Sequence, residues 1–110
     1  MEIQERNVIA AQIYPSWKEK IVYSDDGPHP QTLLETEKSK TLIAGLKPGQ
    51  QIPVHPEGLA TYYFLEGSGS MTVDEEVWHV SPGAIVIIPA GARRGMQAET
   101  QLAFLAVRVA

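Results

Sequence analysis

Apolar and polar residues alternate over short segments of this chain, and glycine or proline separates most segments from the next. The segments are rich in Val, Ile, Tyr and Thr, which pack well on a pleated surface. The pattern predicts nine strands, at residues 20–23, 32–36, 40–45, 51–55, 60–66, 70–73, 77–80, 84–88 and 101–109. Many short strands at close spacing are typical of a β-sandwich or barrel, so the predicted fold class is all-β.

Two of the predicted strands are apolar on both faces, which is unusual for a sheet with one wet side. Residues 84–88 read AIVII and are expected to be buried on both faces. Residues 102–109 read LAFLAVRV and are expected to be either central in a sheet or covered by a second subunit. Residues 1–14 fit a short helix or a strand equally well, so residues 1–17 are expected to form an extra strand or an arm.

Length, charge and residue usage exclude several classes of protein. The 110 residues predict one domain spanning 1–110. The net charge of -4 argues against a nucleic-acid or anionic-membrane surface. The lack of cysteine excludes disulfides, thiolate metal sites and cysteine nucleophiles. No apolar run approaches the ~20 residues of a membrane span, and the N-terminus lacks a secretory pattern, so a cytoplasmic protein is expected.

Two glycine-bounded segments carry a recognisable pattern. The first runs from Gly49 through His55 to Gly67, and the second is a glycine, five apolar residues, Pro89, one residue and Gly91. These residues are in register with the paired motifs of the cupin superfamily, small double-stranded β-helix barrels, which the chain resembles over residues 49–94. The resemblance implies a single cupin barrel of jelly-roll type. Cupins of this size commonly pair through their sheets, so a homodimer is expected.

The chain departs from the cupin pattern at the positions that bind metal. Similar metal-binding cupins hold a divalent ion with two His, one Glu and a third His. Here His55 matches the first His, Glu57 stands at the second, Ala60 or Tyr62 falls at the Glu, and Arg94 replaces the third His. Arginine cannot be a ligand because it stays protonated, and two protein ligands are fewer than catalytic sites use. We therefore expect neither a metal nor another cofactor.

Strand alternation places four polar side chains at the mouth of the predicted barrel: His55, Glu57, Tyr62 and Arg94. The favoured interpretation of Arg94 is an ion pair with Glu57 that fills the place of the lost metal. In the alternative interpretation, its planar guanidinium binds the carboxylate or phosphate of a ligand. A ligand that displaces an internal ion pair would reconcile the two.

The leading hypothesis is a protein that binds a small polar or anionic molecule in a metal-free pocket through these four residues. The alternative is a metal-independent isomerase or epimerase. In this hypothesis His55, oriented by Glu57, abstracts a proton, Tyr62 returns a proton and Arg94 stabilises the developing oxyanion. The third hypothesis is a metal-dependent oxygenase or isomerase whose missing ligands come from His79, from the substrate or from water. The hypotheses leave open whether the protein is an enzyme. In each of them its partner is a small molecule.

Overall fold

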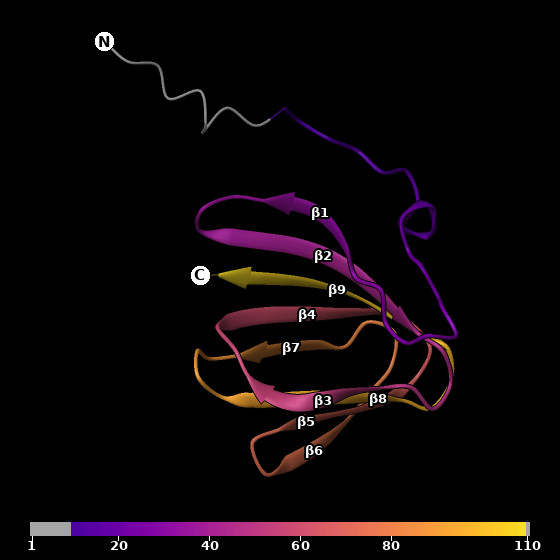
Figure 1. The fold of residues 1–110 in the computed structure, drawn as a ribbon, viewed down its shortest axis with the longest axis vertical. Coiled ribbons are helices and arrows are strands. Elements are labelled where there is room, and N and C mark those ends of the chain that lie inside the picture. Colours follow the sequence, from indigo (N-terminus) through magenta and orange to yellow (C-terminus); the bar gives the residue numbers. More distant parts are fainter. Residues whose placement is uncertain (1–9, 110) are drawn as a thin grey trace.

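The computed structural model describes residues 10–109, which form nine β-strands in two antiparallel sheets (Figure 1). The larger sheet has, in spatial order, β1 (Gln31–Glu35), β2 (Ser39–Leu46), β9 (Leu102–Val109), β4 (Leu59–Glu66) and β7 (Ile85–Ile88). The smaller sheet has β3 (Gln51–Pro56), β8 (Arg93–Ala98), β5 (Gly69–Val73) and β6 (Glu76–Val80). The predicted all-β class is confirmed.

The core lies between the two sheets and is built from alternate residues of each strand. Tyr62, Phe64 and Phe104 form its aromatic part, with ring centroids 5.7 and 5.9 Å apart in the two pairs that share Phe104. The smaller sheet contributes Met71 and Val80, both almost fully buried. Burial of side chains of this size stabilises the fold by ~1.5–3 kcal/mol each, and it fixes which face of each strand points inward.

Eight of the nine predicted strands occur with ends that agree within two residues, but the strand at 20–23 was wrong. The chain instead forms a 3₁₀ turn at Trp17–Glu19, with the hydroxyl of Ser16 accepting from the Lys18 N–H. Tyr23 then packs its ring on Gly45 of β2, where an added Cβ would lie 2.6 Å from the ring. This segment therefore covers a sheet face with side chains and does not pair at an edge. Residues 10–16 form no strand, and the rest of the predicted N-terminal element, residues 1–9, lies outside the described residues.

β8 was not predicted, because it contains no β-branched residue and has Gly95 in its middle. The glycine is required by its neighbour, β3. A Cβ at position 95 would lie 2.8 Å from the Val54 side chain and 2.9 Å from the Ile52 carbonyl oxygen. Tertiary contact with β3, and not the local propensity of its residues, therefore holds β8 in the sheet.

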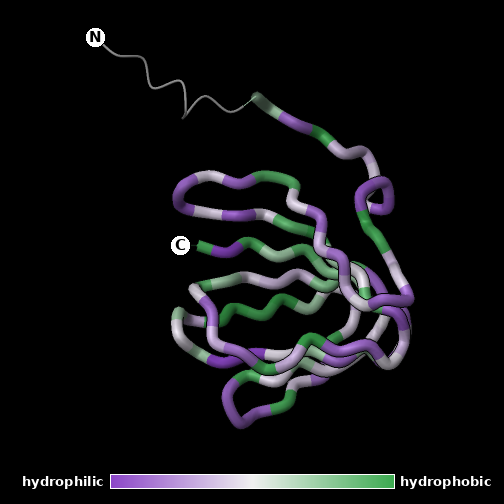
Figure 2. Tube along the Cα trace, viewed as in Figure 1, coloured by the Kyte–Doolittle hydropathy of each residue, from purple (hydrophilic) through white to green (hydrophobic). Residues whose placement is uncertain are grey.

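The two doubly apolar strands differ in their surroundings. β9 is central, between β2 and β4, which confirms one of its two predicted positions. β7 is an edge strand, so its prediction of burial on both faces was wrong for the single chain: Ile85 and Ile87 are 63% and 65% exposed. Figure 2 shows β7 as a hydrophobic strand and the β1–β2 turn as hydrophilic. Within residues 10–109, no helix has the length and apolar character to cross a bilayer.

Gly83 and Gly91 bracket β7, as its sequence pattern predicts. Their φ angles are +92° and +87°, in the left-handed region that favours glycine. Gly91 also donates its N–H to the Glu57 carbonyl at 2.8 Å, which joins the β7–β8 turn to the β3–β4 turn. These two turns, the β1–β2 turn and the end of β9 lie at one end of the barrel (Figure 1), which we call the mouth.

Candidate functional site

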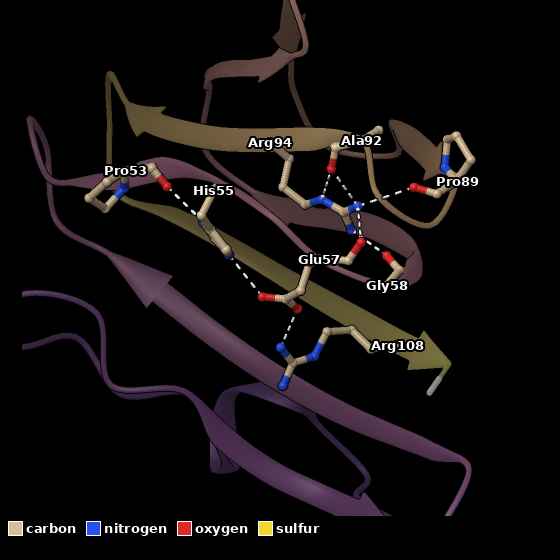
Figure 3. Close-up of polar contacts among 8 residues, drawn as sticks. All are labelled: Pro53, His55, Glu57, Gly58, Pro89, Ala92, Arg94 and Arg108. Atoms are coloured by element: carbon tan, nitrogen blue, oxygen red, sulfur yellow. Dashed lines mark hydrogen bonds and ion pairs between the residues drawn. The ribbon is translucent and has the colours of Figure 1, made fainter.

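A β-bulge in β3 positions the histidine of the first motif. Ile52 is opposite Met96 and His55 is opposite Arg94, so β3 has one more residue than β8 over this stretch. Bulges re-aim the side chains that follow them. The bulged Pro53 carbonyl lies 2.8 Å from Nδ1 of His55 and fixes the ring (Figure 3).

Glu57 joins this histidine to an arginine of the other sheet. Nε2 of His55 lies 2.8 Å from one carboxylate oxygen of Glu57, and the Arg108 guanidinium donates to the other oxygen (Figure 3). Arg108 is on the inward face of β9, the face that also carries Phe104. The contact thus links β3 of the smaller sheet to β9 of the larger sheet across the mouth.

The imidazole ring of His55 lies between two oxygen atoms. Both ring nitrogens face acceptors, a carbonyl oxygen and a carboxylate oxygen. A neutral imidazole donates only one hydrogen bond, whereas the imidazolium donates two. The Nε2 contact joins the ring to the carboxylate of Glu57, which also accepts from Arg108.

These contacts also set the protonation of the carboxylate. Burial raises the pKa of Glu57. Hydrogen bonds from Arg108 and His55, together with their charges, lower this pKa by more than burial raises it. The net effect holds the pKa of this carboxyl below its ordinary value. Glu57 is therefore ionised at neutral pH and stabilised by its neighbours in that form.

The lowered pKa predicts how stability depends on pH. A carboxyl whose pKa is lower in the folded state stabilises the fold above its unfolded-state pKa, and this contribution is lost as the pH falls through the folded-state pKa. We expect Glu57→Gln to destabilise the protein at pH 7 by an amount that shrinks as the pH falls below ~4. Urea unfolding at several pH values measures this. Glu99→Gln, at an exposed position remote from the mouth, should show no such convergence. A pH-independent effect of Glu57→Gln would contradict the prediction.

Arg94 is the largest of the fully buried side chains, at 1% exposure. Its guanidinium makes five hydrogen bonds of 2.8–3.3 Å to four backbone carbonyls, those of Glu57, Gly58, Pro89 and Ala92 (Figure 3). The first two carbonyls belong to the β3–β4 turn and the other two to the β7–β8 turn. Arg94 therefore joins the two turns that carry the chain between the sheets at the mouth.

The predicted ion pair between Arg94 and Glu57 was wrong. Arg94 reaches only the backbone carbonyl of Glu57, whose carboxylate pairs with Arg108 and His55. Among residues 10–109, no carboxylate oxygen lies within 4.0 Å of the Arg94 guanidinium. Its charge is therefore balanced by no carboxylate in direct contact, only by neutral dipoles.

Tyr62 lies deeper than the other predicted site residues. Its side chain is in the core and packs on Phe104, and Ala60 and Phe64 share its inward face, as strand alternation predicts. Burial raises the pKa of Tyr62, and the neighbouring Arg94 guanidinium only partly opposes this. The hydroxyl therefore remains protonated at neutral pH and is a weaker acid than an ordinary tyrosine.

A cavity of about 330 Å³ adjoins the carboxylate of Glu57 at the mouth. Its lining includes Glu57 and Arg108 together with residues of the β1–β2 hairpin: Glu35, Thr36, Glu37, Ser39 and Lys40. Of the four predicted site residues, only Glu57 lines this cavity. His55 contacts the carboxylate of Glu57, and Arg94 is buried against the β3–β4 turn that carries Glu57. Tyr62 lies in the core.

Arg108 was missed by the sequence analysis, although a signal for it exists. In LAFLAVRV it has the same parity as the buried residues Leu102, Phe104 and Ala106. A lone charge on the inward face of an apolar strand predicts a polar contact at the end of the core.

The residues present do not fit the metal site of the cupin pattern. The carboxylate of Glu57 is already bonded on both oxygens, and an arginine occupies the position of the third His. Among residues 10–109, no group of three or more His, Cys, Asp or Glu side chains is placed to hold a metal ion. His79, the substitute ligand of the third hypothesis, is exposed on β6.

Comparison with known proteins identifies the barrel type. The family model described as the cupin domain matches residues 42–108. A conserved protein of unknown function from Streptococcus pyogenes is 26% identical with a TM-score of 0.79, over 94% of this chain and 90% of that one. The TT1209 protein of Thermus thermophilus is 27% identical with a TM-score of 0.80, over 87% and 95%. An uncharacterised double-stranded β-helix protein of Klebsiella pneumoniae is 26% identical with a TM-score of 0.81, over 91% and 90%. No curated protein is significantly similar to the chain.

Proposed function

The chain belongs to the cupin family, and from the charges at its barrel mouth we propose that it binds a small anionic molecule there without a metal. The observation that carries this proposal is the buried Arg94 guanidinium, which has no carboxylate partner among residues 10–109. Among the residues that line the adjoining cavity, Arg108 and Lys40 are cations, and Glu35, Glu37 and Glu57 are anions. We place the anion on the Arg108 and Lys40 side of the cavity, where these two cations attract it.

An accessible donor at the mouth is the guanidinium of Arg108, whose side chain is 32% exposed. Only one guanidinium nitrogen of Arg108 donates to Glu57, so further N–H groups are available to an anion. In this proposal Arg108 binds the anion, and Glu57 orients Arg108 and His55. Arg94 acts through its charge, and Tyr62 lies in the core without lining the cavity.

An NMR-monitored titration tests the proposal. We expect sodium acetate and sodium phosphate to cause saturable shifts of backbone amides in residues 35–40, 55–58 and 108–109. Sodium chloride at matched ionic strength serves as the control, because general screening affects all exposed charges. Shifts that are linear in concentration, or equal for the three salts, would contradict the proposal.

The two other hypotheses make different predictions. Catalysis by His55 as a base needs a ring nitrogen that faces the substrate, whereas both ring nitrogens already contact protein oxygens, those of the Pro53 carbonyl and the Glu57 carboxylate. The isomerase hypothesis predicts solvent deuterium incorporation at carbon in a bound ligand, abolished by His55→Ala. The metal hypothesis predicts one tightly bound ion per chain in elemental analysis. Our proposal predicts substoichiometric metal and a melting temperature unchanged by added Fe²⁺, Mn²⁺, Ni²⁺ or Zn²⁺.

We also propose that two copies pair through the outer face of β7, β4 and β9. The outward residues of these strands carry no charge: Leu59, Thr61, Tyr63, Leu65, Ile85, Ile87, Ala103, Leu105, Val107 and Val109. Tyr14 and Trp17 line a groove on the β1–β2 side of this face, so the chain covers only part of it. The other edge strands are β1, β3 and β6. A glutamate in β1, a glutamate in β6 and two prolines in β3 discourage pairing at these edges. An uncharged face is complementary to its own copy in a two-fold dimer, whereas the charged faces repel.

Light scattering after size exclusion tests the pairing. We expect a dimer for the wild type and a monomer for Ile87→Glu, because the dimer would bury this charge without a partner. Val77→Glu is the matched control, since Val77 is 67% exposed on β6 and should leave the dimer intact. A monomeric wild type, or dissociation by both substitutions alike, would contradict this interface.

A further inference from the structure

Arg108 of the proposed anion site has a second cation opposite it on the adjacent strand. Lys40 of β2 and Arg108 of β9 are Cα partners, so their side chains share the inward face of the sheet. Both line the cavity. Like charges directly opposite each other destabilise a sheet, and Lys40 makes no ion pair within 4.0 Å with any residue of 10–109. An anionic group between the two side chains would remove this repulsion.

Acidic side chains lie on the other side of Lys40. Glu35 of β1 is its Cα partner, and Glu37 follows in the β1–β2 turn. Both glutamates are exposed and line the cavity, and neither forms an ion pair within 4.0 Å among the described residues. Across β1, β2 and β9, the paired inward residues are therefore one acid and two bases: Glu35, Lys40 and Arg108.

The spacing of this row separates the two kinds of charge. Adjacent strands are ~4.8 Å apart, so the acid of β1 and the guanidinium of β9 arise from backbones about two such steps apart. The cations can contact one end of a small molecule while the glutamates contact the other end. A simple anion would use the β2–β9 side of the cavity and leave the two carboxylates next to it unpaired.

We propose that the ligand of the mouth cavity is a zwitterion, with its carboxylate between Lys40 and Arg108 and its ammonium group against Glu35 and Glu37. This inference rests on the proposed anion site and adds the class of molecule. Carboxylate–guanidinium and carboxylate–ammonium contacts are charge-assisted hydrogen bonds, so each end of the ligand adds affinity and selectivity. A mouth with cations alone would select for negative charge only.

NMR titrations with three probes test the zwitterion: acetate, methylammonium and 4-aminobutanoate. We expect 4-aminobutanoate to bind at least ~10-fold more tightly than acetate, and methylammonium to bind more weakly than either. Glu35→Gln should reduce 4-aminobutanoate to the affinity of acetate, while acetate binding stays equal or improves. Lys40→Gln should weaken both. Glu99→Gln, at the opposite end of the barrel, is the matched charge control and should change neither.

The outcomes separate this inference from the proposal on which it rests. If acetate binds at the mouth but 4-aminobutanoate binds no more tightly, the zwitterion is wrong and the anion site stands. The same holds if Glu35→Gln and Glu37→Gln both leave the affinity for 4-aminobutanoate unchanged. If neither acetate nor 4-aminobutanoate binds, both proposals fail.

Discussion

Replacing Arg94 by methionine is expected to lower the free energy of unfolding by about 2–4 kcal/mol. Methionine is long and unbranched and fills similar space, but it donates no hydrogen bonds. The carbonyls of Glu57 and Pro89 accept a backbone N–H group in addition to Arg94. Outside the strand ladders, the carbonyls of Gly58 and Ala92 have no donor other than Arg94 among the described residues. A buried acceptor left unsatisfied costs ~1–3 kcal/mol, so the loss of these two bonds outweighs the relief of removing a buried charge.

Equilibrium urea unfolding at pH 7 measures this loss. Arg93→Met is the matched control, because Arg93 is next to Arg94 in the sequence and its side chain is exposed. This substitution should change the free energy of unfolding by less than ~0.5 kcal/mol. Arg94→Lys retains the charge but cannot reach four carbonyls with one ammonium group, so it should also destabilise. Equal stabilities of wild type and Arg94→Met would show that Arg94 does not hold the two turns together.

Replacing Arg108 by alanine is expected to weaken acetate binding by about 10- to 100-fold, the value of one charge-assisted hydrogen-bonded contact. Glu57→Gln should act in the opposite direction. It removes the negative charge that competes for Arg108, so acetate should bind more tightly than to the wild type. Two substitutions in one ion pair with opposite effects on affinity are difficult to explain by loss of structure.

NMR titration of each variant with sodium acetate gives these dissociation constants. Arg93→Ala controls for net charge, because it removes one positive charge at an exposed position outside the lining of the mouth cavity. Similar losses for Arg93→Ala and Arg108→Ala would attribute the binding to the overall field of the protein. Weaker binding in Glu57→Gln would instead make Glu57 part of the ligand contact.

The strands were predictable because their local pattern and their tertiary surroundings agree. β4 alternates buried with less buried positions, and the longer buried runs of β2 and β9 match their apolar sequences, so hydrophobic pattern and propensity indicate the same structure. β8 shows the limit of this reasoning. Its glycine and polar residues predict a loop, and only the bulged neighbour β3 makes that glycine necessary. The segment 20–23 shows the reverse: its pattern suits a strand, but its aromatic side chain packs on β2 and no neighbouring strand pairs with it.

The sequence predicted where the site lies but not which charged groups pair with one another. Motif spacing and strand alternation brought His55, Glu57 and Arg94 to the mouth, and the structure places them there. The partner of each charge depends on turn geometry that periodicity does not encode. Arg94 turned toward the carbonyls of two turns, and the carboxylate of Glu57 was left to Arg108, a residue 51 positions away in the chain.

The most direct test of the anion site is the response of the arginine side chains themselves. The chain has four arginines, so the Nε–Hε resonances of Arg93, Arg94 and Arg108 can be assigned by substitution and followed during an acetate titration. The account predicts a large saturable shift for Arg108, a smaller one for the buried Arg94 and almost none for the exposed Arg93. No saturable shift at Arg108, or equal shifts at Arg93 and Arg108, would contradict a binding site at the barrel mouth.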